Sequence, residues 1–254
     1  TNKIFLKGKG FTITCQTTYQ KLIKELNAID ELHEISDLDY NVVYEAYTEI
    51  SQTMSGKHLE HYSTPSKVRK MMVKLINPKI HSNGEIDTCC DPVMGTGEFL
   101  VTYLDYIFDK AKDKNITPDW DFIKSYGVCG KESNQIIHQL AVINMLAPSG
   151  EIFDFLKRGN IIHNPFRQKF NNILTKLPFD TKKLKYSYGP IATDNLISVY
   201  IQTIISMLKI NGKCAIILPA GKDLSSKTDP TLVTIREYLM KTCDLQKIIY
   251  LPNG

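Results

Sequence analysis

The sequence predicts an α/β fold with a mainly parallel central sheet, helices on both faces of that sheet, and a short helical segment at the N-terminus. Apolar strand-like runs alternate along the chain with segments whose apolar residues recur at helical spacing, which is the pattern of a parallel sheet. One strand-like run ends in a turn with two glycines, Gly95 and Gly97, that leads into a helix. The 254 residues, 43% of them apolar, suffice for one α/β domain of ordinary size and a small accessory region.

We expect the chain to divide near residue 55. Residues 1–55 carry two amphipathic segments, 17–29 and 38–51, whose apolar residues lie three and four positions apart. They predict an N-terminal accessory segment that is mainly helical. Residues 56–254 hold the remaining motifs and form the main domain. Because the chain starts with threonine and stops directly after a strand-like run, we expect a piece of a longer protein. The main domain itself is then either complete or truncated at its C-terminus.

Composition restricts the classes of partner. The net charge of +4 makes the chain mildly basic, which permits a nucleic-acid partner without requiring one. The sequence shows no signal peptide and no apolar run long enough to cross a membrane, so we expect a soluble cytoplasmic protein with no membrane partner.

The cysteines indicate a reducing compartment. None of the six forms a Cys-x-x-Cys pair, so neither a metal site nor a disulfide framework is expected. Four of them lie in or beside apolar strand-like runs, and we expect these to be buried free thiols: Cys89, Cys90, Cys129 and Cys214.

The first element of the main domain is a helix from Ser66 to Ile76. Thr64 precedes it as an N-cap candidate, and Pro65 stands near its first turn. A strand over residues 86–90 then runs into the stretch DPVMGTGEFL, residues 91–100, and a second helix.

The two glycines of that stretch favour a ligand-binding turn. Glycine adopts positive φ without strain and lets the backbone approach a ligand closely, and the helix that follows offers unpaired N–H groups at its N-terminus. A Gly-x-Gly pair alone is weak evidence for a ligand-binding turn, because an ordinary strand-to-helix turn has the same composition.

The residues around the glycines sharpen this interpretation. The stretch resembles motif I of the S-adenosylmethionine-dependent amino-methyltransferases through Asp91, Pro92, Gly95, Gly97 and Phe99. In the adenine-specific DNA methylases this motif reads Asp-Pro-x-x-Gly-x-Gly-x-Phe-Leu. The resemblance implies a Rossmann-like class I methyltransferase fold, and it implies S-adenosylmethionine as the cofactor that these residues bind.

Upstream of motif I, Tyr62-Ser63-Thr64-Pro65 resembles the Phe-Tyr-Thr-Pro that the same family carries at this distance. The resemblance implies that Tyr62, Thr64 and Pro65 form part of the cofactor pocket. Taken alone, the residues predict only a capped helix start.

Two polar residues follow later strands. A strand over residues 126–132 ends in Glu132, and a carboxylate about 20 residues or more beyond a Gly turn accepts hydrogen bonds from ribose hydroxyls in doubly wound sheets. A solvated carboxylate at a strand end is the alternative. Gly159-Asn160 stands where the family carries Gly-Asp, so the resemblance implies a cofactor-binding position for Asn160, which keeps the acceptor and loses the charge.

The predicted catalytic motif follows a strand that starts at Phe170. The adenine methylases carry Asn-Pro-Pro-Phe or Asn-Pro-Pro-Tyr there; this chain reads Lys176-Leu177-Pro178-Phe179. In the family the side-chain carbonyl accepts a proton of the adenine amine, which favours attack on the methyl group, and the aromatic ring stacks on the flipped base. A charged lysine has three donors and no acceptor, so we expect impaired catalysis, with an activity rescued by a lowered Lys176 pKa as the weaker alternative.

The remaining chain holds a basic loop and four elements. Residues 181–188 carry lysines and tyrosines, which either meet phosphates or form a solvated surface. Apolar patterns then predict helices and strands in alternation over 194–208, 214–219, 235–241 and 247–251.

Over residues 40–254 the ordered motifs resemble the modification subunit of type I restriction-modification systems. The resemblance implies DNA adenine as the methyl acceptor, DNA as a partner and a separate specificity subunit. Two hypotheses follow: a DNA adenine-N6 methyltransferase with a degenerate motif, or a non-catalytic methyltransferase-fold module, a pseudoenzyme with a structural or partner-binding role.

Overall fold

The computed structural model describes residues 64–149, 151–178, 189–218, 224 and 229–251. The chain divides into two units, Thr1–Asp39 and Tyr40–Gly254, and every described residue lies in the second. The predicted N-terminal accessory segment and its boundary near residue 55 lie outside the described residues.

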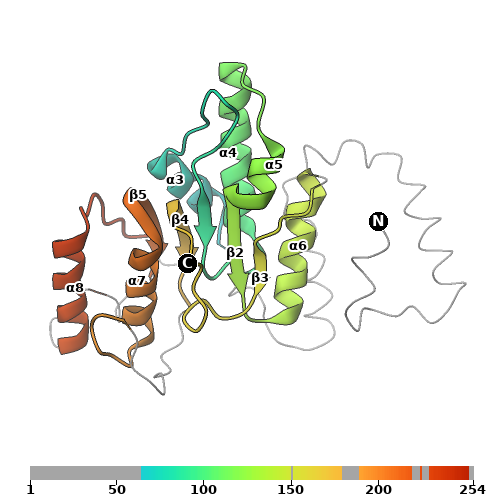
Figure 1. Cartoon of the computed structure of the whole chain (residues 1–254). Helices are drawn as coiled ribbons and strands as arrows, with labels where there is room; N and C mark the ends of the chain where they lie inside the picture. Colours follow the sequence, from blue (N-terminus) through green and yellow to red (C-terminus); the bar gives the residue numbers. More distant parts are fainter. Residues whose placement is uncertain (1–63, 150, 179–188, 219–223, 225–228, 252–254) are drawn as a thin grey trace, which may run out of the picture. The chain divides into compact units, whose positions relative to one another are not determined.

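The described residues form a five-stranded, wholly parallel sheet in the order β3-β2-β1-β4-β5 (Figure 1). The strands are β1 (Cys89–Asp91), β2 (Val128–Glu132), β3 (Leu156–Arg158), β4 (Phe170–Lys176) and β5 (Leu208–Ile217). Because all strands run the same way, their carboxyl ends meet at one edge. The chain moves outward from β1 to β3 and returns to β4, so the order reverses between β1 and β4.

Helices cover both faces of this sheet, as the sequence predicted. One face packs against α3 (Ser66–Ile76), α4 (Glu98–Lys114) and α6 (Gln135–Ser149), and the other against α7 (Leu196–Met207) and α8 (Pro230–Thr242). In Figure 1, α7 and α8 lie next to β5, whereas α6 lies next to β3. Successive residues of β1 alternate between the two faces, with Cys89 in the first core and Cys90 in the second.

The starts of two elements differ from the prediction. β2 begins at Val128, because the preceding residues form the short helix α5 (Trp120–Phe122) and a single π-helical turn, η3 (Ile123–Gly127). Thr64 does not cap α3: the cap position is Pro65 and makes no side-chain hydrogen bond. The backbone N–H of Thr64 instead reaches Glu98 of α4, 3.3 Å from Oε2.

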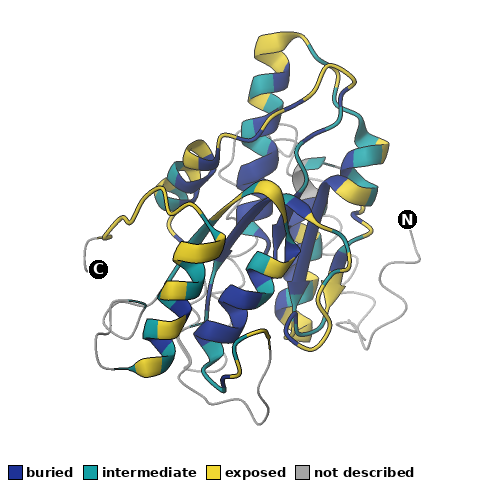
Figure 2. Cartoon of the chain, turned by 60° about the vertical axis from the view of Figure 1, so that its left-hand side comes forward, coloured by how far each residue is buried: buried dark blue, intermediate teal, exposed yellow. Residues whose placement is uncertain are grey.

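β5 and the C-terminal segment 247–251 also differ from the prediction. β5 begins at Leu208, six residues before the predicted strand over 214–219, and it contains a bulge where Asn211 takes a positive φ of 62° and the register with β4 shifts. Cys214 is exposed rather than buried, because β5 pairs only with β4 among the described residues. The strand predicted over 247–251 does not form: this segment pairs with no described strand and leaves Tyr250 83% exposed (Figure 2).

None of the described helices is long and apolar enough to span a membrane.

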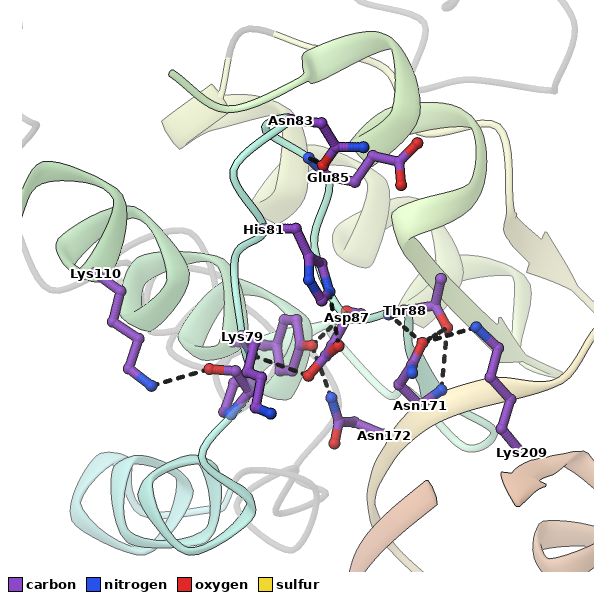
Figure 3. Close-up of polar contacts among 12 residues, drawn as sticks. Lys79, His81, Asn83, Glu85, Asp87, Thr88, Lys110, Asn171, Asn172 and Lys209 are labelled. Carbon is purple, nitrogen blue, oxygen red and sulfur yellow. Dashed lines mark hydrogen bonds and ion pairs between the residues drawn. The ribbon is translucent and has the colours of Figure 1, made fainter. Parts of the chain in front are cut away.

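A buried hydroxyl joins α4 to β1 and β4 at the amino edge of the sheet. Tyr103 is fully buried; its hydroxyl donates to the Asp87 carbonyl and accepts a hydrogen bond from Asn172 Nδ2 at 3.0 Å. Beside it, Thr88 Oγ1 donates to Asn171 Oδ1 at 2.9 Å (Figure 3). These contacts fix the start of β4 beside the residues that lead into β1.

We expect Tyr103→Phe to lower the free energy of unfolding by about 2 kcal/mol, since it leaves the partly buried Asp87 carbonyl and the buried Asn172 amide without their partner. Urea unfolding of both proteins measures the difference. Tyr106→Phe is the matched control, because its hydroxyl bonds Asn77 Oδ1 at the surface, 3.1 Å away, and its loss should cost less than about 0.5 kcal/mol. Equal losses in the two variants would contradict the assignment.

Candidate active site

The predicted site residues gather at the carboxyl edge of the sheet. Asp91 ends β1, Glu132 ends β2 and Lys176 ends β4. In open α/β sheets, ligands bind at this edge where the strand order reverses, which here is the position between β1 and β4.

The Gly turn after β1 has the backbone that its glycines predicted. Gly95 and Gly97 have φ of 53° and 82°, and Gly97 caps the N-terminus of α4. A Cβ added at Gly95 would meet no atom of the described residues within 4 Å, whereas one at Gly97 would lie 3.5 Å from Ala141 of α6. The N–H groups of Gly95 and Thr96 make no hydrogen bond within the described residues. The turn therefore packs against α6 at Gly97. At Gly95, two backbone N–H groups without a described partner lie beside space that no described residue fills.

Asp91 connects this turn to β4. Its side chain is buried, and Oδ1 accepts hydrogen bonds from Thr175 Oγ1 at 2.7 Å and from the Val93 N–H at 3.0 Å. Burial raises the pKa of the Asp91 carboxyl from 3.8 to about 7, although both hydrogen bonds oppose the shift. Glu132 and Glu98 raise this pKa further by repulsion, so the carboxyl edge is an acidic environment.

Glu132 and Asn160 lie on neighbouring chain segments. The Gly159 N–H donates to the Glu132 carbonyl at 2.8 Å. Glu132 Oε1 accepts from the Asn134 N–H at 2.7 Å, which fixes its carboxylate at the start of α6. The side-chain oxygen of Asn160 accepts a hydrogen bond from the Ile162 N–H at 2.8 Å. The acceptor predicted to bind cofactor therefore already holds a hydrogen bond within its own turn.

Arg69 and Glu98 form a buried ion pair that the sequence analysis missed. Arg69 Nη1 lies 2.9 Å from Glu98 Oε2 and also donates to the Thr64 carbonyl. Its Nε donates to Thr102 Oγ1 at 3.3 Å. The pair holds Thr64 and Pro65 against the first turn of α4, next to the Gly turn. No sequence signal pairs these residues, because 29 positions separate them.

The predicted catalytic residues are described in part. Lys176 is half-buried; burial lowers the pKa of its amine, and the Glu98 carboxylate opposes that shift. Leu177 is fully buried, and its N–H donates to the Ile217 carbonyl at 3.1 Å. Pro178 is partly exposed. Phe179, the basic loop at 181–188 and Tyr62 lie outside the described residues.

Among the described residues, no group of three or more His, Cys, Asp or Glu side chains is placed to hold a metal ion.

The parallel sheet and the Gly turn at its reversal point define a Rossmann-like class I S-adenosylmethionine-dependent methyltransferase fold. A putative methyltransferase of this class from Listeria monocytogenes superposes with a TM-score of 0.63 at 12% identity, over 90% of this chain and 67% of that one. A modification subunit of a putative type I restriction enzyme from Vibrio vulnificus gives a TM-score of 0.65 at 20% identity, over 87% of this chain and 46% of that one.

The sequence model of N-6 DNA methylases matches residues 27–254, and the chain belongs to that family. The type I restriction enzyme EcoEI methylase subunit of Escherichia coli is 29% identical over 252 residues, which cover 94% of this chain and 47% of the subunit. The chain spans about half the length, or less, of the curated relatives it matches. Family membership implies S-adenosylmethionine as the cofactor.

The buried carboxyl of Asp91 should make stability fall as pH rises. Because its folded pKa of about 7 lies above the ordinary 3.8, the folded state keeps a proton that the unfolded chain has released. Between pH 5 and pH 8 the free energy of unfolding of the wild type should fall by about 3 kcal/mol relative to that of Asp91→Asn. The expected change is about 1.36 kcal/mol for each pH unit between pH 5 and the folded pKa. The asparagine oxygen can still accept from Thr175 and Val93. Urea unfolding of both proteins at the two pH values measures this difference, and identical pH dependence would contradict it.

Proposed function

We propose that this domain binds S-adenosylmethionine at the carboxyl edge between β1 and β4 and that DNA adenine is presented beside Lys176. One observation carries the proposal: the Gly turn of the family motif lies at the reversal point of the sheet, and the N–H groups of Gly95 and Thr96 make no hydrogen bond to any described residue.

The described residues fit an adenosyl cofactor. Room beside Gly95 allows a ligand to approach the backbone, since a Cβ there would meet none of the described residues within 4 Å. The N-terminus of α4 favours an anionic group, such as a carboxylate. Glu132 at the end of β2 is our candidate for the ribose hydroxyls. The acidic environment of Asp91 and Glu132 suits a ligand that carries positive charge.

Residues on both sides of the turn complete the proposed cofactor site. Thr64 and Pro65 are held beside it through Arg69 and Glu98, and Tyr62 precedes them in the chain. With Asn160, the full set proposed to bind cofactor is Tyr62, Thr64, Pro65, Asp91, Pro92, Gly95, Gly97, Phe99, Glu132 and Asn160.

Lys176 is the reason to propose impaired methyl transfer. S-adenosylmethionine supplies an electrophilic methyl group on a cationic sulfur. The protein must accept a proton from the weakly nucleophilic adenine amine, and a protonated lysine cannot do so. Burial lowers the Lys176 pKa, yet Glu98 acts against neutralisation. Pro178 and Phe179 remain as the proposed base-stacking part of the motif.

The same lysine favours a second candidate function. If Lys176 stays charged, the domain is a non-catalytic methyltransferase-fold module that retains cofactor or DNA contacts, with a structural or partner-binding role. In either case we propose DNA and a specificity subunit as partners in the cytoplasm, because the relatives are subunits of restriction enzymes.

Calorimetric titration with S-adenosylmethionine tests the cofactor site. We expect Gly97→Ala to weaken binding at least about tenfold, because φ of 82° is strained for alanine and the added Cβ would touch Ala141. Glu132→Gln should weaken binding by a similar factor, since hydrogen bonds to a charged acceptor are strong. Glu237→Gln, an exposed position on α8, is the control. No binding by folded wild-type protein would reject the cofactor proposal.

Transfer of a labelled methyl group to DNA tests the catalytic proposal. Lys176→Asn restores a side-chain carbonyl at the end of β4, so we expect its rate to exceed that of the wild type by about 10²-fold, the scale of one transition-state hydrogen bond. Lys176→Met is the control, because it removes the charge and supplies no carbonyl. A wild type as active as Lys176→Asn would show that catalysis is not impaired, and inactivity of both would favour the non-catalytic module.

A further inference from the structure

Asn144 of α6 reaches the Gly turn with its side-chain amide. It is only 3% exposed, and its Nδ2 donates to the Thr96 carbonyl at 2.9 Å. Thr96 stands between the two glycines and is itself 4% exposed. The contact joins residues 48 positions apart, so it depends on how α6 packs against the turn.

The second polar atom of this side chain has no partner. Asn144 Oδ1 is buried and makes no hydrogen bond with any described residue. A buried carbonyl without a hydrogen bond is unfavourable, and an apolar side chain of similar size avoids that cost. The cost of the unpaired Oδ1 therefore offsets the stability that the hydrogen bond from Nδ2 to the buried Thr96 carbonyl contributes, so net stability gives little reason for an amide at this position.

That hydrogen bond restricts the turn where its backbone is least restrained. Gly95 and Gly97 both adopt positive φ, and glycine permits many other conformations. The Gly97 N–H donates to the Met94 carbonyl at 2.8 Å, which closes the turn along the chain. Asn144 adds the contact on the side of α6, where Ala141 also approaches Gly97.

We propose that Asn144 is a positioning residue for the cofactor. By holding the Thr96 carbonyl toward α6, it fixes the peptide between Thr96 and Gly97 and keeps the Gly95 and Thr96 N–H groups free on the side of the ligand. The inference rests on the proposed function, and it assigns part of the cofactor affinity to a residue that need not touch the cofactor.

The test combines binding, stability and amide exchange in Asn144→Leu, with Asn144→Ala as the second variant if the leucine does not fit. We expect cofactor affinity to fall about tenfold, the effect of losing one neutral hydrogen bond, while the urea midpoint changes little, because leucine removes the unpaired Oδ1 but also leaves the buried Thr96 carbonyl without its partner. Hydrogen exchange of the amides from Gly95 to Val101 should accelerate in the cofactor-free variant.

Ser198→Ala is the matched control. Ser198 is fully buried on α7, its hydroxyl also lacks a partner among the described residues, and its described hydrogen bonds go to Asn195 and Gln202 rather than to the Gly turn. We expect this variant to bind cofactor like the wild type and to leave exchange at the turn unchanged.

The outcomes separate the two proposals. Wild-type protein that binds no S-adenosylmethionine rejects the proposed function, and unchanged exchange at the turn in the Asn144 variants then rejects positioning as well. Binding by the wild type with unchanged affinity in folded Asn144 variants overturns the inference alone. A loss of affinity that follows a loss of stability, and that Ser198→Ala shares, would assign Asn144 a structural role only.

Discussion

The hydrogen bond between Asp91 and Thr175 is the contact on which the proposed site depends. It links the last residue of β1 to β4, 2.7 Å from Oδ1 to Oγ1, at the one place where the strand order reverses. The same carboxyl oxygen accepts from the Val93 N–H, so one buried group fixes both the pairing of two strands and the start of the Gly turn. Lys176 follows Thr175 directly, which places the two halves of the proposed chemistry side by side.

Helices α3 and α6 each contribute a side chain that restrains the Gly turn or the first residue after it. Arg69 of α3 holds Glu98, the first residue of α4, through a buried ion pair, and the Thr64 backbone joins the same network. Asn144 of α6 holds the Thr96 carbonyl. A turn that contains two flexible glycines is thus restrained by side chains that come from outside it. Such bracing reduces the conformational entropy that ligand binding would otherwise have to remove.

The charges at the carboxyl edge show how one substitution changes the possible chemistry. Glu98 and Glu132 both act on the buried carboxyl of Asp91, an arrangement that suits a cationic ligand. In the proposed function, Lys176 takes the position where the family motif has a neutral acceptor. Glu98 favours the charged form of that lysine and burial disfavours it. If Lys176 holds the proposed catalytic position, the protonation state of its amine distinguishes the catalytic proposal from the proposed binding module.

The parallel α/β class, the Gly turn and the bounds of α3 could be predicted from the sequence, because they follow from short-range periodicity and glycine backbone preferences. The sequence also indicated which residues end the strands of the site. The Arg69–Glu98 pair, the contact from Asn144 and the absence of a strand at 247–251 emerge only from the packing of the folded chain. Those features depend on which distant segments the sheet register brings together, and a buried partner leaves no periodic signal in the sequence.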